Sequence, residues 1–300
     1  MAAPVEVIIN STSGSVSEEE TRRRLTEQFI AHGVKANINL ANSGKELEEL
    51  SQAAAESEAE VIVAGGGDGT ISTVAVAAFK SGKTLGILPL GTLNNFSKDL
   101  GIPQNVVGAI KVIAGGHTRT IDIAEVNDRN FINNSSIGLY PRIVLRRERQ
   151  QRLGSGKWSA AFWAALRMFR RSPFLKVRIK LGEKEIERKT PFVFVGNNEY
   201  DMNLYTIGRR TTLDAGELSV YFMHRNGRWG IIQLVLHTAF GRLRQWKDFE
   251  EIRTEEVVIH TRRKLLPVAF DGEVRVLQTP LHYRSRPRAL TVLVPKNSDA

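Results

Sequence analysis

The sequence predicts an α/β domain with a mostly parallel sheet, followed by a β sandwich or barrel. Three observations predict this fold class. Up to about residue 120, short apolar runs alternate with helical patterns, which indicates parallel strands covered by helices. Beyond that point, short alternating strands separated by turn-forming residues predominate. The length of 300 residues is enough for two domains, which we expect over 1–121 and from 122 onward.

The first domain is expected to begin with a buried strand, because the run VEVII ends at the turn-forming residues from Asn10 to Gly14. Apolar runs and helical patterns then alternate along the chain. We expect strands over 5–9, 35–40, 61–64 and 85–88, and helices over 18–31, 45–55 and 71–79.

The second domain shows the period-two alternation of half-buried strands. One helical pattern interrupts it, over residues 157–171. We expect strands over 176–180, 192–195, 218–222, 256–260 and 272–277.

The composition excludes several classes of protein. The absence of cysteine excludes disulfides and thiolate metal sites. The basic stretches lack interleaved stacking aromatics, so we expect no nucleic-acid binding. There is no leader pattern and no apolar stretch of about 20 residues, so we expect a cytoplasmic protein. The net charge of +10 favours anionic partners; the alternative is a solvated surface that happens to be basic.

A glycine-rich turn, GGGDGT, follows the third expected strand and opens a helix. It comprises Gly65, Gly66, Gly67, Asp68, Gly69 and Thr70. Backbone N–H groups at such a helix start form an anion site, and glycines let a phosphate approach them. Asp68 suits Mg²⁺ or a hydroxyl proton, and Thr70 suits a helix cap or a phosphate oxygen. The alternative is a plain tight strand–helix turn.

A second polar loop follows the fourth expected strand, within LPLGTLNNFSKDLGIP. Pro89 and Gly91 fix a turn there, and Thr92, Asn94 and Asn95 offer short polar groups. Two such loops at neighbouring strand ends would form two walls of one phosphate cleft, so the spacing predicts a nucleotide site.

GGGDGT followed by PLGTLNNF, with VAFDGEV near the end, resembles the diacylglycerol kinase and sphingosine kinase catalytic family. The layout is similar to its bacterial soluble lipid kinases. The resemblance implies a phosphofructokinase-like α/β N-terminal domain and a β-sandwich C-terminal domain over 122–285. It also implies that residues 286–300 return to the first domain. The implied ligands are ATP with Mg²⁺ and a lipid substrate held between the domains.

The resemblance also implies site residues. Asn10, Ser13 and Gly14 match the family's first nucleotide loop, Gly65 to Thr70 match the second, and Thr92 with Asn94 matches the third. Asp271 is the favoured general base, with Glu273 supporting it or contacting the ribose. Asp68 is the rival base. Asp68 and Asp122 are the candidates to hold Mg²⁺, partly through water.

Two departures from the family pattern concern metal binding. Asn95 stands where the family usually has aspartate, which removes one carboxylate from the expected magnesium network. At the turn that binds a structural Mg²⁺ in bacterial members, this chain has Ala215-Gly216, with Asp214 one position early. We therefore expect no second metal site there.

The lipid side is expected near residues 157–171, where Trp158, Phe162, Leu166 and Phe169 recur at helical spacing between basic ends. Arginines at 142, 146, 147, 149 and 152 add charge upstream, which favours transient binding to an anionic membrane. The alternative for 157–171 is a core-packing helix.

The leading hypothesis is thus an ATP-dependent lipid kinase that acts on a hydroxyl of a diacylglycerol-like lipid. The alternatives are a small-molecule kinase similar to NAD kinases, or a nucleotide- or lipid-binding protein with weak turnover. The sequence does not identify the lipid or the oligomeric state.

Overall fold

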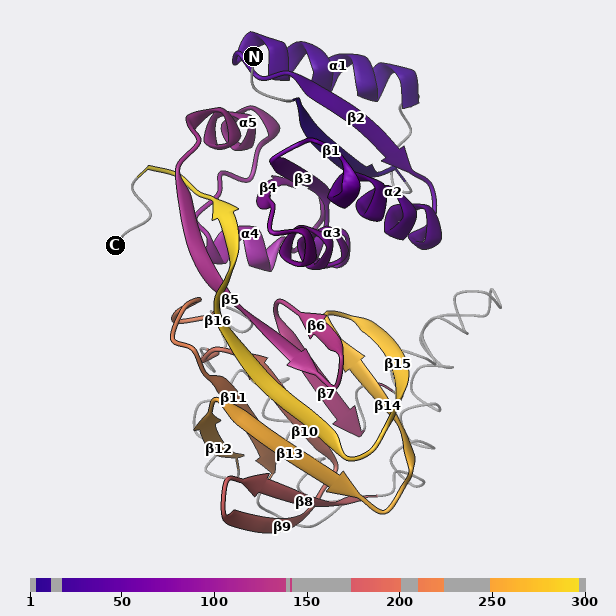
Figure 1. Cartoon of the computed structure of the whole chain (residues 1–300), viewed down its shortest axis with the longest axis vertical. Helices are drawn as coiled ribbons and strands as arrows, with labels where there is room; N and C mark the ends of the chain where they lie inside the picture. The colour runs from indigo at the N-terminus through magenta and orange to yellow at the C-terminus, as the bar shows by residue number, and fades with distance from the viewer. Residues whose placement is uncertain are drawn as a thin grey trace, which may run out of the picture. The chain divides into compact units, whose positions relative to one another are not determined.

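A computed structural model of the chain describes residues 4–11, 18–138, 141, 174–200, 210–223 and 249–296 (Figure 1). The chain divides into two compact units. The first comprises Met1–Ile123, Thr212–Ala215 and Arg286–Ala300, and the second comprises Ala124–Thr211 and Gly216–Ser285. The sequence prediction put the boundary after residue 121 and did not predict that a segment at 212–215 joins the first unit.

The first unit is built on a parallel sheet. Its strands are β1 (Val5–Asn10), β2 (Ala36–Ala41), β3 (Val61–Gly66) and β4 (Thr84–Pro89). They lie in the order β2-β1-β3-β4, and every neighbouring pair is parallel. The last strand, β16 (Leu281–Leu293), pairs in parallel with β4 through Val292 and Leu85. The expected return of the chain's end to this sheet is therefore present.

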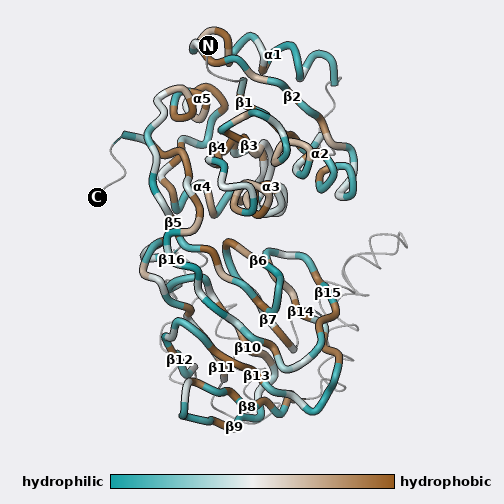
Figure 2. Tube along the Cα trace, in the orientation of Figure 1, coloured by the Kyte–Doolittle hydropathy of each residue, from teal (hydrophilic) through white to brown (hydrophobic). Residues whose placement is uncertain are grey.

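The helices of this unit are α1 (Glu18–Ala31), α2 (Gly44–Glu56), α3 (Asp68–Ser81), α4 (Asn95–Asp99) and α5 (Val106–Gly115). The strands of the parallel sheet lie between these helices (Figure 2). The strand residues Val7, Ile8 and Ile62 are fully buried. The sequence prediction missed α4 and α5. The sequence does contain a local signal for the start of α5. Asn105 is a helix-capping residue, and its side chain accepts the Gly108 N–H at 2.8 Å.

The second unit contains two sheets. One has the order β12-β11-β10-β7-β14-β15, and all its neighbouring strands are antiparallel. Its strands are β7 (Asn134–Gly138), β10 (Phe192–Asn197), β11 (Leu218–Met223), β12 (Phe249–Thr254), β14 (Leu265–Phe270) and β15 (Glu273–Gln278).

The other sheet of this unit joins the start of β16 to β13 and β8, with β9 beyond. Its strands are β5 (Thr118–Val126), β6 (Arg129–Phe131), β8 (Leu175–Leu181), β9 (Lys184–Thr190) and β13 (Glu256–Thr261). Buried side chains from both sheets, such as Val177, Val195 and Val268, form one core. The predicted β sandwich is therefore confirmed.

The five strands expected in this unit are present, each with bounds that differ by one or two residues. The sequence prediction missed β9 and β12, whose sequences KEIERKT and FEEIRT are mostly charged or polar. The helix predicted over 157–171, and the upstream arginines, lie outside the described residues. Across the part of the chain that the structure describes, no helix has both the length and the apolar character to cross a membrane.

Tyr283 makes the stability of the second unit depend on pH. It is fully buried, packs edge-to-face on Phe131, and shares a hydrogen bond of 3.1 Å with the Ser135 hydroxyl. Burial raises the pKa of Tyr283 above its ordinary value, and the Ser135 hydrogen bond lowers it by less. Folding therefore favours the neutral phenol. As pH rises above about 10, the tyrosine ionises more readily in the unfolded chain than in the folded protein, so the free energy of unfolding falls.

We expect Tyr283→Phe to flatten the alkaline decline in the free energy of unfolding, measured by urea denaturation between pH 8 and 11. The slope at high pH should fall by up to about 1.4 kcal/mol per pH unit. At pH 7 the change should be small, because the Ser135 hydroxyl keeps its bond to the Ala269 carbonyl at 2.9 Å. Identical alkaline slopes in the two proteins would contradict this reading.

Candidate active site

In the first unit, two loops meet at the carboxyl ends of β3 and β4. The Leu90 N–H donates to the Gly66 carbonyl at 3.1 Å. A Cβ atom added to Gly91 would lie 2.4 Å from the Cα of Gly67. Because β3 and β4 are parallel neighbours, their ends lie at the same edge of the sheet. The two polar loops identified in the sequence are therefore in direct contact.

The four glycines of the turn have different reasons to lack a side chain. A Cβ on Gly65 would meet Ile9 at 2.7 Å, and one on Gly66 would meet Thr70 at 2.6 Å. These two glycines are explained by packing inside the protein. Gly69 is exposed in the first turn of α3, and a Cβ there would meet nothing within 4 Å. Its open surface leaves room for a phosphate next to the N–H groups that begin α3.

Asp68 connects the glycine turn to the second loop. One carboxylate oxygen accepts the Asn95 N–H at 3.2 Å, and the other accepts the Phe96 N–H at 3.1 Å. Asn95 and Phe96 are the first residues of α4, so the Asp68 side chain satisfies N–H groups that a helix start leaves unpaired. Asp68 itself is the first residue of α3, and its negative charge suits both helix starts.

Three further predicted residues lie close to this turn. The Asn10 side-chain amide donates to the Thr70 hydroxyl at 3.4 Å, which joins the end of β1 to the turn. Asn94 has a left-handed backbone and donates to the Gly91 carbonyl at 2.9 Å. Thr92 is exposed in the same loop. Ser13 and Gly14 lie outside the described residues.

Asp122 has a different environment from that expected of a metal ligand. Its side chain is buried, and one oxygen accepts the Arg288 N–H at 2.8 Å. Arg288 has φ +49°, so Asp122 holds β16 at a local break in its extended backbone. Among the described residues, no group of three or more His, Cys, Asp or Glu side chains could hold a metal ion. The Mg²⁺ site thus stays a prediction.

Asp214, the shifted residue at the family's structural metal turn, forms a salt bridge of 3.1 Å with Arg119. Both residues belong to the first unit, so this pair ties the segment 212–215 to the start of β5.

In the second unit, Asp271 has φ +47° in the turn between β14 and β15. Its carboxylate accepts three backbone N–H groups: Ile132 at 2.8 Å, Asn133 at 2.8 Å and Asn134 at 3.1 Å. A carboxylate offers about four lone-pair sites, so most of its accepting capacity is used. Glu273, by contrast, is exposed, with Arg275 at 3.4 Å.

The partners of Asp271 are the residues that sequence reasoning missed. The run NNSS at 133–136 lies more than 130 residues before Asp271, so no local signal in the sequence connects the two. Its backbone amides hold the acidic turn, and the Asn134 side chain also lies 3.4 Å from the Tyr200 hydroxyl. Asp68 belongs to the first unit and Asp271 to the second.

The chain thus joins an α/β unit with an open glycine turn to a β sandwich that carries an acidic turn. Residues 4–126 match the model of the diacylglycerol kinase catalytic domain. Residues 143–294 match that of the YegS C-terminal NAD kinase beta sandwich-like domain. The chain belongs to the family that joins a diacylglycerol kinase catalytic domain to a YegS C-terminal beta sandwich-like domain.

Three curated relatives are similar to this chain. A protein of Klebsiella pneumoniae named "Probable lipid kinase YegS-like" is 33% identical over 159 residues, which cover 52% of this chain and 54% of that protein. A diacylglycerol kinase of Staphylococcus epidermidis is 34% identical over 146 residues, which cover 46% of this chain and 44% of that protein. An uncharacterized Synechocystis protein is 26% identical over 268 residues, which cover 87% of this chain and 61% of that protein. The chain therefore spans about half the length of these relatives.

The fold is also that of solved structures. A diacylglycerol kinase structure from Bacillus anthracis superposes with a TM-score of 0.71, at 23% identity, and the match covers 98% of this chain and 97% of that one. At this identity the likeness shows the fold.

Proposed function

We propose that this protein is an ATP-dependent kinase that transfers the γ-phosphoryl group to a hydroxyl of a diacylglycerol-like membrane lipid. Family membership supports a lipid kinase. The observation that carries the proposal is the open glycine at position 69, because internal packing does not account for its missing side chain. A phosphate close to the first N–H groups of α3 does account for it.

Phosphoryl transfer requires positioning, charge neutralisation and a base for the attacking hydroxyl. The glycine turn would position the phosphates of ATP. Asp68 fits Mg²⁺ because it is partly exposed and because the hydrogen bonds from the Asn95 and Phe96 N–H groups use only part of its accepting capacity. The ion would neutralise charge on the phosphate oxygens. Asp122, which is 1% exposed, supports this role less well.

The acidic turn would supply the base. Asp271 remains our predicted base, and its carboxylate is held by three backbone donors. Those three bonds fix the carboxylate in place against the backbone of residues 132–134. This favours a holding role for Asp271 and makes the exposed Glu273 the alternative base.

The acceptor lipid would be reached at an anionic membrane surface on the cytoplasmic side. The net charge of +10 supports such an association, at roughly 1 kcal/mol for each basic residue near the surface. Diacylglycerol, phosphatidylglycerol, a sphingoid base and ceramide all present a suitable hydroxyl.

The test is transfer of label from γ-³²P-ATP to a mixed lipid extract, with NAD in a parallel reaction. We expect labelled lipid from the wild type and none from Asp68→Asn, whose folding is checked by circular dichroism. Labelled NAD with unlabelled lipid would assign the chain to small-molecule kinases. Absence of any product, with ATP still bound, would indicate a binding protein.

A further inference from the structure

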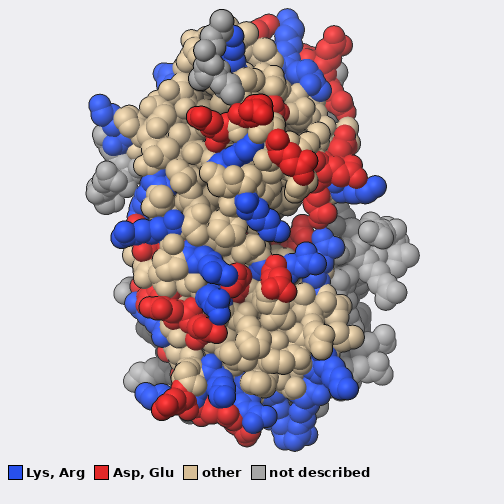
Figure 3. All heavy atoms as spheres, in the orientation of Figure 1, with Lys and Arg blue, Asp and Glu red and all other residues tan. Residues whose placement is uncertain are grey.

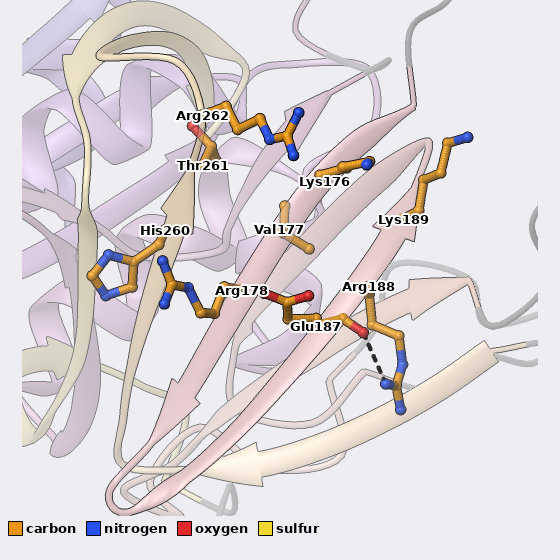
Figure 4. Close-up of a pocket in the computed structure, with 9 residues that line it drawn as sticks. All are labelled: Lys176, Val177, Arg178, Glu187, Arg188, Lys189, His260, Thr261 and Arg262. Carbon is orange, nitrogen blue, oxygen red and sulfur yellow. Dashed lines mark hydrogen bonds between the residues drawn. The ribbon is translucent and has the colours of Figure 1, made fainter.

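A basic cleft lies on the second unit, where β8, β9 and the end of β13 run side by side (Figure 4). Its volume is about 540 Å³. The charged side chains that line it are five cations, one histidine and one acid: Lys176, Arg178, Arg188, Lys189, Arg262, His260 and Glu187. An adjoining hollow of about 270 Å³ shares Lys176, Lys189 and Arg262 and adds Arg263. Basic residues also gather on the lower part of the molecule in Figure 3.

The register of β8 and β9 shows that this charge is not a general property of the sheet. Arg178 lies opposite Glu187, and Lys180 lies opposite Glu185, so two cross-strand pairs are complementary. In the remaining charged pair, which lines the same cleft as Arg178 and Glu187, Lys176 lies opposite Lys189. Like charges directly opposite each other destabilise a sheet. The cleft therefore carries a cost that the neighbouring pairs avoid.

Other members of the lining are already neutralised. Arg178 forms a salt bridge of 3.3 Å with Glu185, and Arg188 forms one of 3.0 Å with Glu250. For Lys176, Lys189 and Arg262, no carboxylate of the described residues lies within salt-bridge distance. The Lys189 ammonium lies 5.7 Å from the centre of the Phe174 ring. The uncompensated charge is thus concentrated at one end of the cleft.

We propose that this end of the cleft binds a phosphate group. A phosphate carries up to two negative charges on several oxygens, so one group can be shared by the ammonium groups of Lys176 and Lys189 and the guanidinium of Arg262. In Figure 4 Lys176 and Lys189 extend from β8 and β9, and Arg262 extends from the segment that follows β13. All three residues line the same cleft. A bound phosphate would remove the repulsion within the like-charged pair. The inference does not depend on the proposed kinase activity.

The phosphate could belong to a small ligand or to a lipid headgroup, and two probes separate these sources. The first is inorganic pyrophosphate, measured by isothermal titration calorimetry. The second is sedimentation with phosphatidylcholine vesicles that contain phosphatidylglycerol. Both are applied to the wild type, to Lys176→Gln/Lys189→Gln, and to Lys180→Gln. Lys180 is the matched control, because it is exposed on the same strand but lies opposite Glu185.

We expect the double variant to bind at least one probe about tenfold or more weakly, and Lys180→Gln to bind like the wild type. Loss for pyrophosphate alone identifies a small phosphate ligand, and loss for vesicles alone identifies a lipid headgroup. Without any probe, the double variant should be no less stable than the wild type. Equal binding of both probes by all three proteins would overturn the proposal, and so would an equal loss in Lys180→Gln.

Discussion

Replacing Gly91 by alanine is expected to lower the free energy of unfolding by about 3 kcal/mol and to abolish ATP binding. The new Cβ would lie 2.4 Å from the Gly67 Cα and 2.7 Å from the Asn94 side-chain oxygen. The first of these neighbours is backbone, so the two loops must separate to make room. Urea denaturation and calorimetry with a non-hydrolysable ATP analogue measure the two effects.

Two other glycines serve as controls, because a Cβ on either would meet nothing within 4 Å. Gly44→Ala, in the first turn of α2, should leave binding unchanged, and its stability should be unchanged or raised by about 0.5–1 kcal/mol. Gly69→Ala should fold normally, or be stabilised by about 0.5–1 kcal/mol, and yet bind the analogue weakly. If Gly91→Ala keeps wild-type affinity, the contact between the loops does not shape the nucleotide site. If Gly69→Ala keeps wild-type affinity for the analogue, the phosphate does not approach the backbone at Gly69.

Replacing Asp271 by alanine is expected to be the most damaging single change in the second unit. It removes the acceptor of three backbone N–H groups at once. Hydrogen bonds to a charged group are worth about 1.5–3 kcal/mol each and are not additive, so we expect a loss of about 4 kcal/mol. Phosphoryl transfer to lipid should fall together with the stability. Denaturation curves and the labelled-ATP assay measure the two losses.

Glu273→Gln separates the holding role from the catalytic one. Glu273 is exposed, so its replacement should change stability by less than about 0.5 kcal/mol. If Glu273 is the base, transfer should fall by about 10²–10⁴-fold in a protein that folds normally. If its activity is retained, and Asp271→Asn is inactive under conditions where it is folded, Asp271 is the base. Asp271→Asn with substantial activity would exclude that role.

The sequence by itself determined the class of both units and most of their elements. The strands of the first unit are continuous apolar runs, and its longer helices have regular periodicity, so both could be identified locally. The glycine turn and the loop after β4 were also readable, because turn residues and spacing are local signals. Motifs of this kind were sufficient to indicate the family, which the matches over 4–126 and 143–294 then showed.

The tertiary structure decided what individual polar residues do. Asp271 bonds to backbone 137 to 139 residues away, and Asp122 to Arg288 166 residues away. Lys176 faces Lys189 because of a strand register that no local pattern specifies. The physical reason is common to these cases: a side chain's periodicity shows whether it is buried, but its partner depends on which distant strands pair and in which register.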